Sequence, residues 1–353
     1  MIAKQHFTRV ISRRDFLKLA AAAGLLAGCG RQLPTTPAAG QVEQPTVAPT
    51  NTTVPPAGIS TPPPTPAPTD TLAPAPSVAP APADELPHLA VARGADPAAI
   101  TRAAIAVLGG IERFVKPGAD VIIKPNICAD YHPPEYATTT NPVVVGTLVA
   151  MCLEAGARRV RVMDNPFGGT PESAYAVSGI AEAVKAAGGL MEVMSPVKFA
   201  RFDIPDGRDI TAWDVYRDVI ETDVLINVPI AKHHSLARLT LGGKNLMGVI
   251  LNPNRFHQNL GQRIADLLSL VRPTLTVVDA VRILVAHGPT GGNLSDVREM
   301  NTVIASHDTV AADAYAATLF GLTGADIAYV RAAADMGLGT LDLSSVRVEE
   351  VSV

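Results

Sequence analysis

Lysines beside glycine-rich or asparagine-containing turns are the residues of this sequence best suited to binding an anion. The segment 242–248 reads Gly-Gly-Lys-Asn-Leu-Met-Gly. Glycines at a helix start expose backbone N–H groups at the positive end of the helix dipole, which suits a phosphate or carboxylate. The segment is not a Walker A loop, because Asn rather than Ser or Thr follows the lysine. We predict that Gly243, Lys244 and Asn245 bind a small anionic ligand.

Carboxylates and amides stand at the ends of several expected strands, where they would meet the lysines. Asp164 follows the expected strand 160–163, and Asp279 follows the expected strand 275–278. A carboxylate a few ångströms from a lysine keeps both groups ionised and can act as an acid or base. The predicted catalytic residues are Lys124, Asp164, Lys232 and Asp279, and Asn126 and Asn227 complete the predicted ligand-binding set.

Histidines in loops offer a second interpretation, a metal site. Imidazole nitrogens, together with a carboxylate such as Asp279, are ligands that zinc or iron accepts. His233 and His234 are adjacent and would point to opposite sides of an extended segment, so only one of them is expected to be a direct ligand. These residues do not identify a cofactor, and a divalent metal is one candidate. The predicted metal ligands are His233, His257 and His287.

The chain has three cysteines and no C-x-x-C pattern, so no iron–sulfur cluster motif is present in the sequence. Cys128 follows the turn 124–126, and the nearby Lys124 would favour its reactive thiolate form. Alternatively, Cys128 is a small buried hydrophobic residue, as Cys152 would be in its apolar helix. Both interpretations stay open, as does a disulfide bond between the two cysteines.

Short β-branched runs alternate with alanine-rich stretches after residue 86. This alternation favours an α/β fold, in which a mainly parallel sheet is flanked by helices, as a single domain over 87–353. The carboxyl ends of parallel strands meet at one edge of the sheet, where ligands of such folds bind. We expect strands at 121–123, 160–163, 224–226, 275–278 and 302–305, and helices near 98–113, 142–155, 173–187, 258–271 and 308–320.

The N-terminal part of the chain departs from this pattern. Residues 12–18, Ser-Arg-Arg-Asp-Phe-Leu-Lys, precede a short apolar run that ends in Leu-Ala-Gly before Cys29, as is typical of a twin-arginine signal peptide with a lipoprotein cleavage site. We predict a signal peptide over 1–28, lipidation of Cys29, and a disordered linker rich in Pro and Thr over 29–86. The domain would then be extracytoplasmic and anchored to the cell membrane, with the twin-arginine translocation machinery as a partner.

Charge and motif content argue against several functions. The formal net charge is -4, and binding to a nucleic acid duplex needs a basic surface, so no nucleic-acid partner is expected. The patterns G-x-S-x-G, H-E-x-x-H and G-x-G-x-x-G do not occur in the sequence. Their absence removes the usual sequence signals of serine hydrolases, zincins and Rossmann dinucleotide-binding proteins.

Several ordered motifs resemble one known family. They are Ile-Lys-Pro-Asn at 123–126, Thr-Thr-Thr-Asn-Pro at 138–142, Gly-Lys-Asn-Leu-Met-Gly at 243–248, His-Gly-Pro-Thr-Gly-Gly at 287–292 and Ala-Ser-His-Asp at 305–308. These residues are similar to the family of domain of unknown function 362, over essentially the whole expected domain. The resemblance implies a fold and a set of residues, and it names no reaction. Many members of that family carry a ferredoxin-like, cysteine-rich segment, which is not found in these 353 residues.

The residues and the resemblance together predict an exported, lipid-anchored protein that binds a small anionic ligand, or acts on it, at the carboxyl ends of its strands. Two alternatives stay open: a metal-dependent or redox-accessory protein, and a non-catalytic binding module tethered to the surface. Strand-end side chains that converge in one enclosed cleft would favour a ligand site, whereas a flat apolar patch elsewhere would favour the tethered module.

Overall fold

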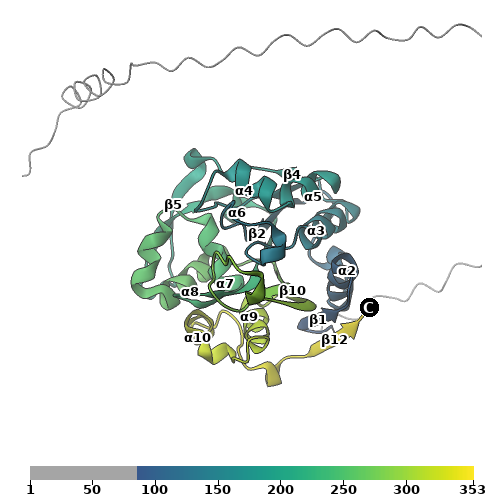
Figure 1. Cartoon of the computed structure of the whole chain (residues 1–353). Coiled ribbons are helices and arrows are strands. Elements are labelled where there is room, and N and C mark those ends of the chain that lie inside the picture. Colours follow the sequence, from purple (N-terminus) through teal and green to yellow (C-terminus); the bar gives the residue numbers. More distant parts are fainter. Residues whose placement is uncertain (1–85) are drawn as a thin grey trace, which may run out of the picture. The chain divides into compact units, whose positions relative to one another are not determined.

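The structure, a computed structural model, describes residues 86–353 (Figure 1). The predicted signal peptide over 1–28, the predicted lipidation site Cys29 and the predicted linker up to residue 85 lie outside the described residues. Within the described range, no helix combines the length and the apolar character that a membrane span requires.

One large sheet forms the centre of the described part. Its strands lie in the order β12-β1-β11-β10-β7-β2-β3-β4, and β8 and β9 extend it beside β10. The neighbouring pairs from β10 to β4 are parallel, whereas β11 is antiparallel to both of its neighbours. The predicted α/β fold with a mainly parallel sheet is therefore confirmed. The strands are β1 Leu89–Arg93, β2 Asp120–Pro125, β3 Arg159–Val162, β4 Leu190–Met191, β7 Val224–Val228, β8 Ile230–His234, β9 Arg238–Thr240, β10 Leu275–Leu284, β11 Val297–Ser306 and β12 Val348–Ser352.

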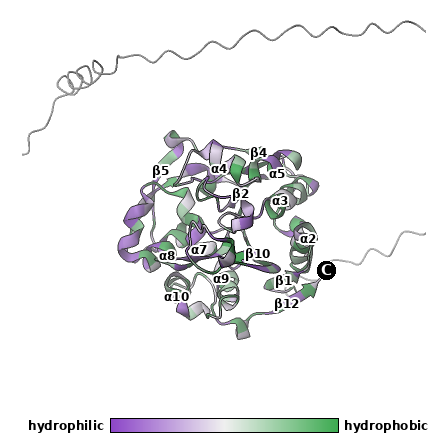
Figure 2. Cartoon of the chain, in the orientation of Figure 1, coloured by the Kyte–Doolittle hydropathy of each residue, from purple (hydrophilic) through white to green (hydrophobic). Residues whose placement is uncertain are grey.

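Helices cover both faces of the sheet because strand residues alternate between two hydrophobic cores. Val121 and Ile123 of β2 belong to one core, and Ile122 between them belongs to the other. The first core is completed by α2 to α5, and the second by α8 to α10 and a separate two-stranded ribbon, β5–β6. Figure 2 shows hydrophobic and hydrophilic stretches alternating along these elements. Their bounds are α2 Pro97–Val107, α3 Pro142–Glu154, α4 Pro171–Val177, α5 Ile180–Ala186, β5 Phe199–Asp203, β6 Ala212–Tyr216, α6 Arg217–Glu221, α7 Gly242–Asn245, α8 Leu260–Val271, α9 Thr309–Thr318 and α10 Ala328–Asp335.

Local capping signals in the sequence set several helix ends. The side chain of Asn141 accepts the backbone N–H of Val143 at 2.9 Å, so α3 begins with an asparagine cap followed by proline, as the sequence predicts. The expected helix over 173–187 is instead two helices, α4 and α5. Gly179, with φ of 69°, separates them, because a residue in the left-handed region interrupts the regular helical backbone.

Candidate functional site

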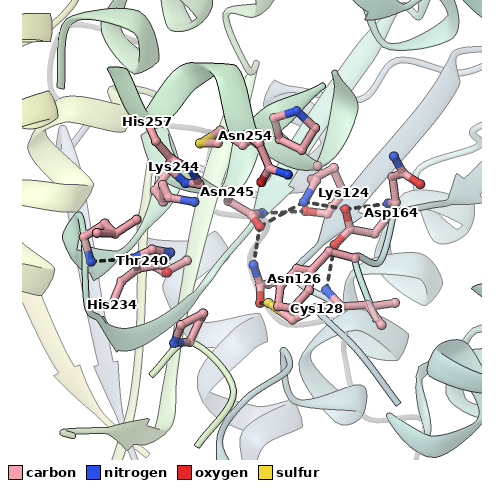
Figure 3. A pocket seen from close by; sticks show the side chains of 18 of the residues that line it. Lys124, Asn126, Cys128, Asp164, His234, Thr240, Lys244, Asn245, Asn254 and His257 are labelled. Atoms are coloured by element: carbon pink, nitrogen blue, oxygen red, sulfur yellow. Dashed lines mark hydrogen bonds and ion pairs between the residues drawn. The ribbon is translucent and has the colours of Figure 1, made fainter. Parts of the chain in front are cut away.

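A cavity of about 320 Å³ lies at the carboxyl ends of β2 and β7 (Figure 3). The sheet order reverses there, because β3 and β4 lie on one side of β2 while β7 and β10 lie on the other. Ligands of open α/β sheets bind at such switch points. The walls come from the turn after β2, the end of β3, the β8–β9 hairpin and the segment from α7 to residue 257.

Lys124 and Asp164 form a buried ion pair in the cavity wall. Nζ of Lys124 lies 2.8 Å from Oδ1 of Asp164, and their side chains are 1% and 4% exposed. The same Nζ donates to the backbone oxygen of Pro125 and to Oδ1 of Asn245, each at 2.9 Å. Burial lowers the pKa of Lys124, and the charge of Asp164 opposes that shift. The three N–H donors of Lys124 all have partners, so this pair fixes the shape of the wall.

Three asparagines form a hydrogen-bonded chain next to this pair. Oδ1 of Asn245 accepts from Nδ2 of Asn126 at 2.9 Å, and Nδ2 of Asn245 donates to Oδ1 of Asn227 at 2.8 Å. Asn227 in turn donates to the backbone oxygen of Gly242. The structure thus brings together the predicted ligand-binding asparagines. Asn126 and Asn245 line the cavity, whereas Asn227 lies behind Asn245 and orients its amide.

Lys244 differs from Lys124 because its charge is not neutralised within the fold. Lys244 lines the cavity, and among residues 86–353 its ammonium group has no hydrogen-bond or ion-pair partner. Burial, chiefly, lowers the pKa of Lys244 to about 8; the nearby Cys128 opposes the shift, and the charges of Lys232 and Lys124 add to it. At pH 7 the group therefore remains mostly protonated. It is a free cation at the cavity, at a position that the sequence predicts for ligand binding.

His234 adds an uncharged donor to the cavity. Its Nδ1 accepts the backbone N–H groups of Leu236 at 3.1 Å and Ala237 at 3.2 Å, which leaves the ring proton on Nε2. Burial first, and then the charge of Lys244, lower the pKa of His234 to about 3. The sequence predicts that only one of the two adjacent histidines is a direct ligand. However, the residue that lines the cavity is His234, not the selected His233.

The structure does not gather the three predicted metal ligands. His257 lines the cavity, but Nδ1 of His233 accepts the backbone N–H of Gly288 at 3.1 Å. His287 is 76% exposed and contacts Asp296 at 2.7 Å. Within the range 86–353, no group of three His, Cys, Asp or Glu side chains is arranged to hold a metal ion. The predicted set is not formed because its members lie on separate segments, and His233 and His287 have partners of their own.

Asp279, a predicted catalytic residue, lies outside the cavity. It is 1% exposed, and its two carboxylate oxygens accept the backbone N–H groups of Asn141 at 2.7 Å and Val281 at 3.0 Å. Burial raises the pKa of Asp279 to about 6, although these two hydrogen bonds oppose the shift. Its position at the end of β10 is as expected, but its contacts connect β10 to the start of α3, which is a structural role.

The backbone N–H groups of the glycine segment already have a partner, the carboxyl group of Asp313. Those of Gly242 and Gly243 donate to the two oxygens of Asp313 in α9, at 2.6 and 2.8 Å. Burial raises the pKa of Asp313 to about 7. The predicted direct role of Gly243 in ligand binding is therefore not supported. Asp313 is a residue that sequence reasoning missed, and its signal was a carboxylate within the alanine-rich stretch 311–317.

Lys232 of β8, the remaining predicted catalytic residue, lies directly behind the cavity wall. Its side chain is fully buried, and Nζ donates to the backbone oxygens of Thr138 and Pro289 and to Sγ of Cys128. Cys128 itself lines the cavity. Cys152 is buried in α3, where burial raises its thiol pKa to about 12. Both cysteines are free thiols, so the structure holds no disulfide between them.

Comparison with known proteins gives a family, a related protein and distant structural likenesses. The family model described as "Domain of unknown function (DUF362)" matches residues 121–318. A thylakoid-associated protein of Synechocystis sp. is 26% identical over 246 residues, which cover 65% of this chain and 72% of that protein.

Among solved structures, the lactate racemase apoprotein from Thermoanaerobacterium thermosaccharolyticum aligns with a TM-score of 0.42 and 11% identity, over 62% of this chain and 54% of that one. A protein from Thermotoga maritima also aligns with a TM-score of 0.42, at 12% identity, over 65% of this chain and 60% of its own. The alignments therefore span little more than half of each of these two structures.

Proposed function

Because this chain belongs to the DUF362 family, whose name states no reaction, we propose its function from the cavity itself. The domain binds a small organic anion at the carboxyl ends of β2 and β7, and Lys244 is the residue that holds the anionic group. The observation that carries this proposal is the ammonium group of Lys244, which lines the cavity and has no partner among residues 86–353.

The charge balance around the cavity supports an anionic ligand. Lys124, Lys232 and Lys244 bring three ammonium groups into the wall or directly behind it, and the carboxylate in contact with one of them is that of Asp164. Positive charge that is not neutralised in a partly enclosed site attracts anions strongly, because water screens it poorly there. Nε2–H of His234 can donate to a second oxygen of the same ligand.

The size and the lining of the cavity support an organic anion rather than a bare inorganic ion. Ligand pockets of proteins commonly range from about 300 to 1,000 Å³, and this cavity of about 320 Å³ is large enough to be one. Phe167, Leu236 and Met247 contribute apolar wall beside the polar groups. A carboxylate or phosphate at Lys244 with a short carbon skeleton against these residues matches that lining. This convergence of polar strand ends in one cleft favours a ligand site over a flat docking module.

Calorimetric titration of the full chain with inorganic phosphate, succinate and 3-phosphoglycerate tests this function. At least one organic probe should bind the natural protein more tightly than inorganic phosphate does. Lys244→Met keeps the length of the side chain and removes its charge, so it should weaken that binding by at least about tenfold, as for the loss of one charged hydrogen bond.

Lys116→Met is the matched control, because Lys116 is an exposed lysine whose ammonium donates to the backbone oxygen of Glu112. The control should bind the probe as the natural protein does. Equal affinity in Lys244→Met, or no binding of any probe at millimolar concentration, would contradict the proposal.

We further propose that the chain is exported by the twin-arginine route and anchored to a membrane through Cys29. The support is the segment 12–29 and the similarity to a protein whose name associates it with thylakoids, a membrane system. In a bacterial host, Cys29→Ala should abolish labelling of the chain by radioactive palmitate and move it from the membrane fraction to the soluble one. The double change Arg13→Lys and Arg14→Lys should retain the chain in the cytoplasm. Membrane attachment of both variants would contradict this route.

A further inference from the structure

We propose that Cys128 is the nucleophile of this cavity, with its thiolate stabilised by Lys232, and that it adds reversibly to an electrophilic carbonyl carbon of the bound anion. The ligand class is then an anionic aldehyde or a 2-oxo acid. The choice of ligand depends on the proposed anion site, whereas the reactivity of the thiolate can be tested without any ligand.

Lys232 is the first observation behind this assignment. Its side chain is fully buried, and Nζ has three acceptors: the backbone oxygens of Thr138 at 2.5 Å and Pro289 at 3.1 Å, and Sγ of Cys128 at 3.0 Å. Among residues 86–353 no carboxylate lies within ion-pair distance of this ammonium group. A buried charge without a counter-charge is costly. Of the three acceptors, Cys128 is the one that can become an anion.

The neighbouring lysine, Lys124, provides a comparison because it has a permanent counter-charge. Lys124 is equally buried, and Asp164 lies 2.8 Å from its ammonium group. Cys128 occupies at Lys232 the position that Asp164 occupies at Lys124. Asp164 is buried, but Cys128 is only partly buried and lines the cavity, so its sulfur is accessible to a ligand. Lys232 therefore pairs with an anion that can react.

The other polar contact of Cys128 provides an acceptor for the proton of the thiol form. Sγ lies 3.3 Å from Oδ1 of Asn126, an oxygen to which the thiol can donate its proton. When the thiol ionises and its proton leaves to solvent, Sγ retains the N–H of Lys232 as a donor. Each protonation state thus has a partner in the wall. Lys244, the free ammonium at the same cavity, is the independent feature that brings a ligand to this sulfur.

The reaction step balances with groups that line the cavity. The thiolate electron pair forms a bond between Sγ of Cys128 and the carbonyl carbon, while the π bond of the carbonyl breaks and its electron pair moves to oxygen. That oxygen takes a proton from water, which replaces the proton that the thiol released to solvent, so Lys244 keeps the charge that holds the anionic group. The product is a hemithioacetal, no group leaves and no oxidant is required. The same steps in reverse release the ligand.

The rate of alkylation of Cys128 by iodoacetamide at pH 7, resolved by peptide mass spectrometry on the full chain, tests the nucleophile. In this assay the sulfur–carbon bond forms and iodide leaves. Because the ammonium group of Lys232 lies 3.0 Å from Sγ and favours the reactive anion, the rate should be about tenfold above that of free N-acetylcysteine. Lys232→Met should remove this advantage, and Lys116→Met should keep it.

Cys152 serves as the internal control for folding, because this buried thiol should stay unmodified while the domain is intact. Where Lys232→Met exposes Cys152, the comparison with N-acetylcysteine in the natural protein still decides the result. A Cys128 rate equal to or below that of the free thiol would overturn the assignment.

A second measurement separates this proposal from the proposed anion site. Glyoxylate, an anionic aldehyde, should protect Cys128 from alkylation more strongly than acetate of equal concentration, and Lys244→Met should abolish the difference. Fast alkylation without protection by either anion would retain the nucleophile and contradict the anion site as its ligand source. Anion binding with slow alkylation would retain the anion site and reject the nucleophile. Equal protection by glyoxylate and acetate would reject addition to the carbonyl.

Discussion

The glycines that begin α7 and the lysine that follows them both carry groups that can bind an anion. They differ in whether those groups already have a partner within the fold. The N–H groups of Gly242 and Gly243 are saturated by the carboxylate of Asp313. The ammonium group of Lys244, the next residue, has no partner among residues 86–353. In the first part the fold provides its own anion, and in the second it leaves a place for one. A motif therefore indicates binding only where its donors are still free.

Removal of the internal anion should have the largest effect on stability. Asp313→Ala leaves two buried backbone N–H groups without an acceptor, and each such group costs about 1–3 kcal/mol. We expect the free energy of unfolding in urea to fall by about 3 kcal/mol, with additional loss from the space left in α9. Asp206→Ala is the matched control, because Asp206 is 69% exposed and pairs loosely with Arg272 at 3.8 Å.

That control should change stability by less than about 0.5 kcal/mol, as expected for a surface ion pair. If Asp313→Ala were equally mild, the carboxylate would not be what holds the glycine segment, and the contrast between the two parts would fail.

A methyl group placed at Gly248 should disturb the paired lysine without removing any charge. A Cβ there would lie 2.1 Å from Oδ1 of Asp164 and 2.6 Å from Nζ of Lys124, so the ion pair must separate or shift. We expect Gly248→Ala to lose about 1–3 kcal/mol of stability, as for an overpacked core site. Because the pair is part of the cavity wall, affinity for the organic anion should also fall.

Gly146→Ala in α3 is the control for the added methyl group, since its nearest neighbour would be the backbone oxygen of Ala183 at 3.3 Å. Alanine is the better helix former, so this variant should lie within about 1 kcal/mol of the natural stability. If Gly248→Ala bound the organic anion as tightly as the natural protein does, the shape of the Lys124–Asp164 wall would not matter for binding.

The pH dependence of anion binding should distinguish the free lysine from the paired one. The pKa of Lys244 is lowered to about 8 in the folded chain, and the anion binds the protonated form. Affinity for succinate, whose own charge is constant above pH 7, should therefore be nearly level below pH 8. It should fall towards tenfold per pH unit above that value. Calorimetric titration at pH 6.5, 7.5, 8.5 and 9.5 measures this slope.

Lys244→Arg sharpens the same experiment, because a guanidinium group stays charged throughout this range. If the variant binds succinate at pH 7.5, its affinity should show little loss up to pH 9.5. A slope that persists in Lys244→Arg would assign the titration to another group.

Several of the residues that line the cavity could be expected from the sequence because strand ends are local features. Lys124, Asp164 and Asn245 lie 40 or more residues apart from one another, yet their placement after β-branched runs or in a glycine segment predicts that they meet at one sheet edge. The sequence does not predict which acceptor each hydrogen-bond donor contacts in the folded chain. The pairing of Lys232 with Cys128, and of Asp313 with the glycine segment, depends on contacts between distant parts of the chain.

The same distinction explains the fold. The five expected strands coincide with β2, β3, β7, β10 and β11, except that the third structural strand, β3, ends one residue before the expected end at 163. Each of the five contains buried β-branched residues. The edge strand β12 has no counterpart among the expected strands. It reads Val-Glu-Glu-Val-Ser and is partly exposed, and its pairing with β1 joins segments more than 250 residues apart. A pattern of buried runs cannot reveal an edge strand whose order comes from its partner.

The smallest effect is expected at His287, a predicted metal ligand that the structure places away from the cavity. Its side chain is 76% exposed, and its backbone φ is 54°, which asparagine tolerates better than most residues. His287→Asn should therefore change the free energy of unfolding by less than about 1.5 kcal/mol, the range of a single hydrogen bond. Affinity for the organic anion should stay at the natural value.

Titration with zinc tests the separation of the predicted metal ligands. If the natural chain bound zinc tightly, and both His287→Asn and His257→Asn lost that binding, the two segments would be able to come together around a metal. Unchanged zinc binding in His287→Asn would instead agree with the separation of the His287 and His257 segments. Lys244 would then remain the group at this edge of the sheet whose partner must come from outside the described chain.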